Sequence, residues 1–380
     1  MMNKAYEKRF SAHPAFWLVG GAALLAIHVY YYFRIRTLAG PGWVSSLWLG
    51  WSLAMLELCF LARKTSKLGS DTQRKWTDRL ACTWMVFAAA AFVILCVENC
   101  VFHLLGARAV PGFEELLSFA LAGIVVILGV RQANTIQTVR LELPTAKLPD
   151  GAERVRVVQM SDLHLGPWVG RELLRQIVDK VNAAKPDIVV MTGDLADGPV
   201  EGHEEDAELL REIRAEDGIF AVTGNHDYYD DIDGAVGFME EAGMRVLCNE
   251  AVEACGIIVL GVDDDAHLIK AEWNLTRSET AVLHMEAEQE KKFLLLLRHR
   301  PIVEPGTEGH FDLQLSGHTH GGQLFPYFNS RHILTHHDRG FKRLKCGGCL
   351  YVSNGAGYVG PPVRLLAPPE IVVIDIVKEK

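Results

Sequence analysis

The chain has 380 residues, a formal net charge of −9, and a hydrophobic fraction of 49%. It is too long for one typical domain, so we expect at least two structural units. The acidic balance argues against nonspecific nucleic-acid binding, which needs a basic face. It leaves open a phosphate-bearing substrate, because bound metal ions can supply positive charge locally.

Long apolar stretches are confined to the first part of the chain. Four of them approach the roughly 17–25 residues that a helix needs to cross a bilayer. They cover residues 16–33, 43–62, 80–105 and 116–130. The first follows basic residues as a signal peptide does, but it ends in aromatic residues and then Arg34 and Arg36, without a small-residue cleavage pattern. We therefore predict a transmembrane region with about four helices over residues 1–135.

Basic residues beside these stretches predict the orientation. Between the second and third stretch lie Arg63, Lys64, Lys67, Arg74, Lys75 and Arg79, and the N-terminal segment holds Lys4, Lys8 and Arg9. Positive-inside bias places both segments in the cytoplasm. Four spans then return the chain to the cytoplasm. We expect a multi-pass protein of the cell (inner) membrane whose C-terminal domain faces the cytoplasm.

Residues 136–152 are expected to form a linker, and the pattern changes from Glu153 onward. Short β-branched runs over 154–160, 187–191 and 219–223 alternate with helix-like stretches over 171–184 and 205–215. This alternation of strand and helix indicates an open α/β sheet. We assign residues 153–380 to this α/β domain.

A polar cluster follows each predicted strand. The clusters are Ser161-Asp162-Leu163-His164, Thr192-Gly193-Asp194, Gly224-Asn225-His226-Asp227 and, after the run 312–315, Gly317-His318-Thr319-His320-Gly321-Gly322-Gln323. In such sheets, ligands bind beyond the carboxyl ends of the strands. Taken alone, the first cluster could be a surface turn and the second says little. The last one, with two histidines flanked by glycines that permit close backbone approach, favours a metal cluster. Together they predict one metal site.

Two cysteines near the end of the chain have the spacing of a metal or redox pair, in Cys346-Gly347-Gly348-Cys349. A zinc site of this kind needs a second pair of ligands. We interpret the segment as a Gly-rich turn with two incidental thiols.

In this order, with His299 before the last cluster, the motifs resemble the calcineurin-like metallophosphoesterase superfamily over about residues 153–377. Gly261-Val262-Asp263-Asp264 and Pro369-Glu370-Ile371 are similar to its bacterial membrane-associated branch, which includes transmembrane proteins with a metallophosphoesterase domain. The resemblance implies a four-layer β-sandwich flanked by helices, here preceded by an α-helical transmembrane bundle. It also implies that residues 153–380 are the catalytic domain.

The resemblance further implies a ligand set for two divalent metal ions. Asp162, His164 and His320 would hold the first ion, Asn225, His299 and His318 the second, and Asp194 would bridge both. A mixed His, Asp and Asn set suits Mn, Fe or Zn better than Ca.

Two further residues take catalytic roles in this resemblance. His226 would lie beside the substrate phosphoryl group as proton donor or transition-state stabiliser, and Asp197 would orient it. His310 lies near His299 and is an alternative to it as a ligand. Asn354 stands where a basic residue is expected in relatives, which leaves one substrate contact in doubt.

Two metal ions can clamp the attacking and leaving oxygens of an in-line displacement and acidify a water so that it attacks as hydroxide. We therefore expect hydrolysis of a phosphomonoester, phosphodiester or pyrophosphate bond, with lipids and nucleotide-linked lipids among the candidate substrates because of the membrane region. A metallo-β-lactamase-like site would open with a His-x-His-x-Asp-His cluster, which the sequence lacks. The alternative is a membrane sensor or scaffold with a catalytically inactive phosphoesterase domain.

Overall fold

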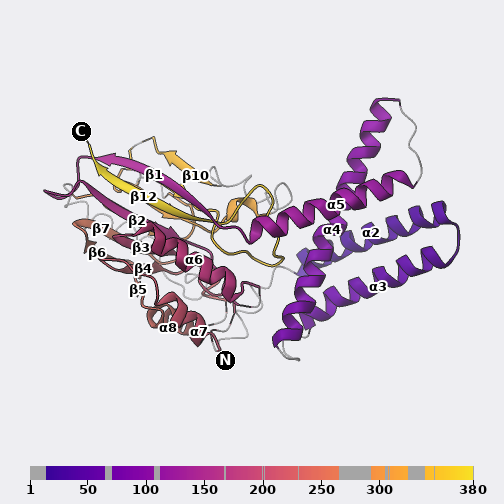
Figure 1. Ribbon diagram of the computed structural model, residues 1–380, viewed down its shortest axis with the longest axis horizontal. Coiled ribbons are helices and arrows are strands. Elements are labelled where there is room, and N and C mark those ends of the chain that lie inside the picture. Colours follow the sequence, from indigo (N-terminus) through magenta and orange to yellow (C-terminus); the bar gives the residue numbers. More distant parts are fainter. Residues whose placement is uncertain are drawn as a thin grey trace. The chain divides into compact units, whose positions relative to one another are not determined.

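The computed structural model describes residues 14–64, 71–106, 112–166, 168–198, 200, 202–229, 231–264, 292–303, 307, 309–323, 339–345 and 347–379. The chain divides into two compact units. One contains helices α2 to α5, and the other contains every strand in the described residues (Figure 1).

The N-terminal unit is helical. Its helices are α2 (Pro14–Ala39), α3 (Trp43–Lys64), α4 (Asp71–Leu104) and α5 (Phe113–Ala133). Each predicted apolar stretch falls largely within one helix. By length and composition, two helical segments within the described residues suffice to cross a membrane, Arg79–Leu104 of α4 and Phe113–Ala133 of α5.

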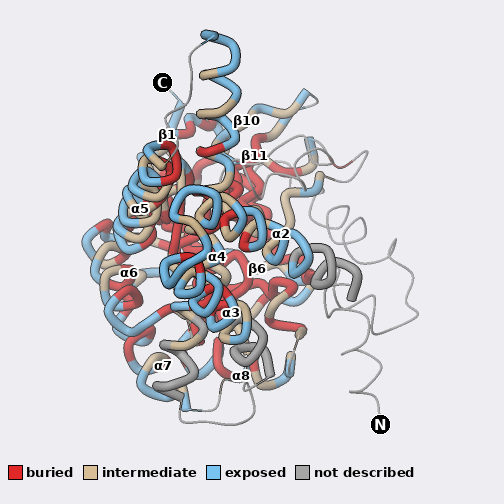
Figure 2. Tube along the Cα trace, turned by 90° about the vertical axis from the view of Figure 1, so that its right-hand side faces the viewer, coloured by how far each residue is buried: buried red, intermediate tan, exposed pale blue. Residues whose placement is uncertain are grey.

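Aromatic rings form the interior of this unit. The rings of Trp48 on α3 and Phe119 on α5 stack with centroids 5.5 Å apart, and Tyr31 on α2 packs against Phe119 at 4.9 Å. Most other side chains of these helices are exposed or only partly buried, as the pale blue and tan segments of Figure 2 show. Apolar residues such as Leu116 and Ile127 on α5 point outward, as in helices that face lipid.

Two six-stranded mixed sheets form the other unit, which confirms the predicted α/β fold class. The first has the order β1 (Gln137–Thr145), β12 (Glu370–Lys378), β2 (Arg154–Met160), β3 (Ile188–Thr192), β4 (Ile219–Val222) and β5 (Arg245–Val246). The second has the order β10 (Gly340–Arg343), β11 (Cys349–Val352), β9 (Leu313–Ser316), β8 (Leu294–Arg298), β7 (Ile257–Val262) and β6 (Glu250–Ala254). Strands β2 to β5 are parallel, and so are β7, β8, β9 and β11.

The segment expected to be a linker, 136–152, contains strand β1. This strand pairs in parallel with β12, from Gln137 opposite Glu370 to Thr145 opposite Lys378. Its alternating apolar residues, among them Leu141 and Leu143, pack into the core between the sheets. The expectation differed because the strand's partner is the last strand of the chain, which no local pattern reveals.

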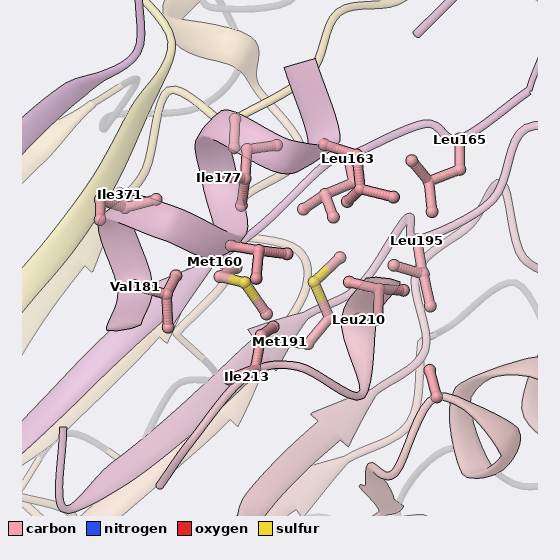
Figure 3. Packing of buried hydrophobic residues seen from close by; sticks show 14 of the residues in the cluster. Met160, Leu163, Leu165, Ile177, Val181, Met191, Leu195, Leu210, Ile213 and Ile371 are labelled. Carbon is pink, nitrogen blue, oxygen red and sulfur yellow. The ribbon is translucent and has the colours of Figure 1, made fainter. Parts of the chain in front are cut away.

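Helices α6 (Arg171–Ala184), α7 (Glu204–Leu210) and α8 (Ile232–Glu241) contribute to a core with the first sheet. The apolar side of α6 packs through Ile177 and Val181 near Met160 and Met191 (Figure 3). The predicted helix 171–184 coincides with α6, whereas the stretch 205–215 is helical only as far as Leu210.

A second core lies between the two sheets, where alternate residues such as Val157 and Val190 meet Val259 and Leu295. Strands β3, β7 and β8 are buried on both faces, which explains their continuous apolar sequences. Cys349 is buried on β11, and Cys346 lies outside the described residues.

Candidate metal centre

The residues expected to bind metal follow the carboxyl ends of five strands. Asp162 and His164 follow β2, Asp194 follows β3, Asn225 follows β4, His299 follows β8, and His318 and His320 follow β9. Strands β2, β3 and β4 are parallel neighbours in one sheet, and β8 and β9 in the other. Their carboxyl ends therefore meet at one edge of each sheet, which is the usual place for a ligand site.

The three residues expected to hold the first ion lie together. His164 Nε2 is 3.0 Å from His320 Nε2, and His320 Nε2 is 3.5 Å from Asp162 Oδ1. All three side chains are buried, and their ligand atoms lie within 4.8 Å of one another. The group could therefore hold one metal ion.

A second group contains Asp194, His299 and His318. His299 Nε2 lies 3.2 Å from Asp194 Oδ2 and 3.2 Å from His318 Nδ1. Asp194 also belongs to a group with His164 and His226, and its Oδ2 is 3.7 Å from His164 Nε2. Asp194 thus lies within 3.7 Å of one expected ligand of the first ion, His164, and within 3.2 Å of one expected ligand of the second, His299.

Asn225 is buried, and its neighbours Gly224 and His226 both approach the Asp194 carboxylate. It follows Gly224, where a Cβ atom would come within 2.2 Å of Asp194 Oδ1, so only glycine allows this approach. Of the two candidate histidines on the second sheet, His299 lies in a metal-competent group, and His310 belongs to none of the groups formed by the described residues.

Five of the expected ligands have a left-handed backbone. Their φ angles are 52° for Asp162, 49° for His164, 56° for Asp194, 72° for His318 and 52° for His320. Residues with a side chain rarely adopt this conformation, and it persists only where the surroundings enforce it. Such strain gathers at functional sites. In this chain the left-handed residues turn the backbone sharply after β2, β3 and β9.

His226 is held at two points. Its Nδ1 lies 2.9 Å from Asp197 Oδ1, and its backbone N–H donates to Asp194 Oδ1 at 2.8 Å. Burial lowers the pKa of His226, but the charge of Asp194 and the hydrogen bond to Asp197 outweigh it and raise that pKa to about 9. This pKa corresponds to a protonated ring at neutral pH in the metal-free chain.

The calcineurin-like phosphoesterase family matches residues 155–322 of the chain. An uncharacterized metallophosphoesterase of Aquifex aeolicus (strain VF5) is 37% identical over 257 residues, which are 67% of this chain and 97% of that protein. The chain belongs to the metallophosphoesterase family.

Other metallophosphoesterases match the same part of the chain. A Danio rerio protein named transmembrane protein with metallophosphoesterase domain is 32% identical over 68% of this chain and 61% of its own length. The uncharacterized metallophosphoesterase YkuE of Bacillus subtilis (strain 168) is 29% identical over 64% of this chain and 87% of its length. These matches confirm the family that the motifs predicted.

The electrostatics of the metallophosphoesterase site shift the pKa values of its histidines in opposite directions. Burial, followed by the charge of His226, lowers the pKa of His164 to about 4, so its ring is neutral at pH 7. Burial lowers the pKa of His299, but the Asp194 carboxylate outweighs this and raises it to about 10, which favours a cation at that position. His299 Nδ1 lies 2.8 Å from the Thr192 carbonyl, and this contact directs Nε2 toward Asp194.

Asp227 ends the third polar cluster, and no sequence pattern assigned it a role. Its buried carboxylate accepts hydrogen bonds from the backbone N–H groups of Gly224 (2.8 Å), Asp194 (3.0 Å), Leu195 (3.1 Å) and Ala196 (3.3 Å). It therefore joins the loops after β3 and β4. Only its place at the end of the motif hinted at this, because three of its four donors follow a different strand, β3.

Arg364 is a second residue that the sequence did not indicate. Its side chain is fully buried, and it donates to the carbonyl groups of Gly357 (3.0 Å), Asn354 (2.8 Å) and Ala367 (3.0 Å). Its Nη2 lies 3.1 Å from His320 Nδ1. The guanidinium thus ties the chain after β11 to an expected ligand of the first ion.

Asn354, which stands where a basic substrate contact was expected, is buried. Its Nδ2 donates to Glu370 Oε2 at 3.0 Å and to the Pro368 carbonyl at 3.2 Å. Glu370 also accepts from the Tyr351 hydroxyl at 2.8 Å. These contacts give Asn354 a supporting position between β11 and β12.

Proposed function

We propose that the chain is a membrane-anchored phosphoesterase with two metal ions, and that it hydrolyses a phosphomonoester, phosphodiester or pyrophosphate bond. One observation carries the proposal: the Asp194 carboxylate lies 3.7 Å from His164 of the first expected ligand group and 3.2 Å from His299 of the second, and these residues come from loops of both sheets. All seven expected ligand positions hold suitable residues, which argues against an inactive scaffold.

When bound, a pair of divalent ions supplies a nucleophile at neutral pH and offsets charge on the phosphoryl group. Asp162, His164 and His320 are proposed to hold the first ion, Asn225, His299 and His318 the second, with Asp194 between them. The donor set, of imidazole nitrogens with carboxylate and amide oxygens, fits Mn, Fe or Zn.

His226 is proposed to protonate the leaving oxygen from Nε2. Asp197 contacts Nδ1, so the proton on that nitrogen stays in the hydrogen bond and Nε2 is the nitrogen left for the substrate. The depth of the side chain suits this role, because His226 is 19% exposed, whereas His164 and His299 are fully buried.

We further propose that the N-terminal unit anchors the enzyme in the cell membrane and that the substrate is amphiphilic, such as a lipid or nucleotide-linked lipid with a phosphate ester. The two apolar segments of α4 and α5 and their outward-facing leucines and isoleucines support the anchor. The name of the Danio rerio relative, a transmembrane protein, also supports it.

The deciding experiment is an assay of the purified full-length protein in detergent with Mn²⁺. The panel contains phosphomonoesters, phosphodiesters and lipid pyrophosphates, each with and without a chelator. We expect metal-dependent release of phosphate or a phosphorylated product from at least one class. A protein that binds two ions and hydrolyses none of them would favour the scaffold alternative.

A further inference from the structure

Tyr229 contacts both Asn225, an expected metal ligand, and His226, the proposed proton donor. Neither the motifs nor the proposed function involve Tyr229. Its backbone N–H donates to the His226 carbonyl at 3.0 Å. Its hydroxyl lies 2.8 Å from Asn225 Nδ2, which donates to it, and its ring centroid is 4.5 Å from that of His226. The side chain is partly buried.

The contact between the Tyr229 hydroxyl and Asn225 orients the side-chain amide of Asn225. An asparagine side chain ligates a metal ion through its oxygen, because both hydrogens sit on the nitrogen. Asn225 Oδ1 is buried and has no hydrogen-bond partner among the described residues, while Nδ2 is bound to the Tyr229 hydroxyl. The hydroxyl therefore anchors one end of the amide and leaves the oxygen for the proposed second ion. Donation from the N–H also polarises the amide and makes its oxygen a better ligand.

The contact between the Tyr229 ring and His226 affects the orientation of the His226 imidazole. The imidazole of His226 contacts two other rings, Tyr229 at 4.5 Å and His164 at 4.7 Å, measured between centroids. Asp197 fixes Nδ1. Removing the tyrosine ring would take away one of these two ring contacts and allow the imidazole to tilt.

We propose that Tyr229 is a positioning residue, which aims the Asn225 amide through its hydroxyl and the His226 ring through its own ring. The inference rests on the proposed function. Partners of metal ligands typically contribute about 10- to 100-fold in metal affinity. The two contacts come from different parts of one side chain, so two substitutions separate them.

Tyr229→Phe removes the hydroxyl and keeps the ring. In the full-length protein, Mn²⁺ titration by calorimetry should show a weakening of the second ion by about 10- to 100-fold with the first ion little changed. Raising Mn²⁺ should restore most of the turnover. Tyr229→Leu should weaken the same ion and also lower kcat at saturating Mn²⁺, because the ring is lost as well.

Two controls distinguish amide aiming from a general loosening of the loop. Tyr228→Phe removes the neighbouring hydroxyl, which donates to Asp263 instead of binding Asn225, and should leave the affinity for the second ion unchanged. Asn225→Asp provides two equivalent oxygens that need no amide orientation. In that background Tyr229→Phe should no longer weaken the second ion.

Wild-type affinity for both ions in Tyr229→Phe would overturn the inference. An equal loss in Tyr228→Phe, or an undiminished loss in the Asn225→Asp background, would also overturn it. If the wild-type protein itself binds fewer than two ions, the proposed function fails first, and the calorimetric titration of the wild type shows this separately.

Discussion

Among single residues, Asp194 lies closest to both expected ligand groups, because its Oδ2 is 3.7 Å from His164 Nε2 and 3.2 Å from His299 Nε2. Asp194→Asn replaces one carboxylate oxygen with an amide nitrogen that cannot ligate. We expect wild-type protein to take up about two Mn²⁺ ions per chain and the variant to lose occupancy at both positions, measured by elemental analysis after loading. Asp206→Asn is the matched control, since Asp206 pairs with His203 and Arg171 outside these groups. Full occupancy in Asp194→Asn would contradict the bridging role.

Substitution of His226 separates an effect on catalysis from an effect on metal binding. General acid catalysis contributes about 10²–10⁴ in rate. His226→Ala should lower kcat by a factor in this range while both ions stay bound. The loss should shrink for a nitrophenyl ester, because that leaving group needs little protonation. Asp197→Asn should show the same trend more mildly, because Asp197 acts through Nδ1 of His226. Loss of metal with unchanged turnover per bound metal pair would make His226 a ligand instead.

At the scale of elements, Asp227 holds the loops after β3 and β4 together through four backbone N–H groups. Each buried donor left without a partner costs about 1–3 kcal/mol. Asp227→Ala should therefore lower the free energy of unfolding by several such increments, even with chelator present. Asp194→Asn should cost much less under that condition. Thermal unfolding of both variants with a chelator makes the comparison, and equal stabilities would show that Asp227 does not join the loops.

Strands β2 and β12 are joined by a paired ion contact with a predictable pH dependence. Arg156 donates to Asp375 through Nε at 2.7 Å and through Nη2 at 3.0 Å. The hydrogen bonds from Arg156 lower the pKa of Asp375 below its ordinary value. A lowered pKa in the folded state adds stability above the ordinary pKa, and this is lost as the pH falls through the folded value.

Asp375→Asn should consequently speed hydrogen exchange in the β2 and β12 peptides at pH 7. At a pH below the folded pKa of Asp375, the variant and the wild type should exchange alike. Mass spectrometry compares the two proteins at the same pH, with Asp150→Asn on an exposed turn as the control. A difference that stays constant down to low pH would mean that the ion pair is not its cause.

At the scale of the whole molecule, the proposed anchor fixes the side of the membrane on which the catalytic domain acts. The basic segment between the second and third apolar stretches, together with the four spans expected from the sequence, predicts that this domain faces the cytoplasm. A periplasm-dependent reporter fused after Lys380 should be inactive, and the same reporter inserted within residues 107–111 should be active. Activity at the C-terminal fusion would show that the spans were miscounted.

The sequence alone indicated much of this architecture. Strands such as β2 and helices such as α6 were visible because β-branched runs and a period of 3.6 are local signals. The clusters that contain His164, Asp194 and His320 were visible because glycines and ligand residues follow the predicted strands directly in the sequence. The same motifs predicted the family, which the matched relatives confirm.

Tertiary structure decided what depends on partners far away in the chain. Strand β1 belongs to a sheet because it pairs with β12, the last strand of the chain. Asp227 joins two loops because it accepts hydrogen bonds from residues that follow another strand, β3. Arg364 and Tyr229 carry no motif, and their contacts with His320 and Asn225 exist only in the folded chain. Local sequence determines which residues can ligate or pair. Long-range packing determines which of them meet, because hydrogen bonds and metal ligands act over a few ångströms.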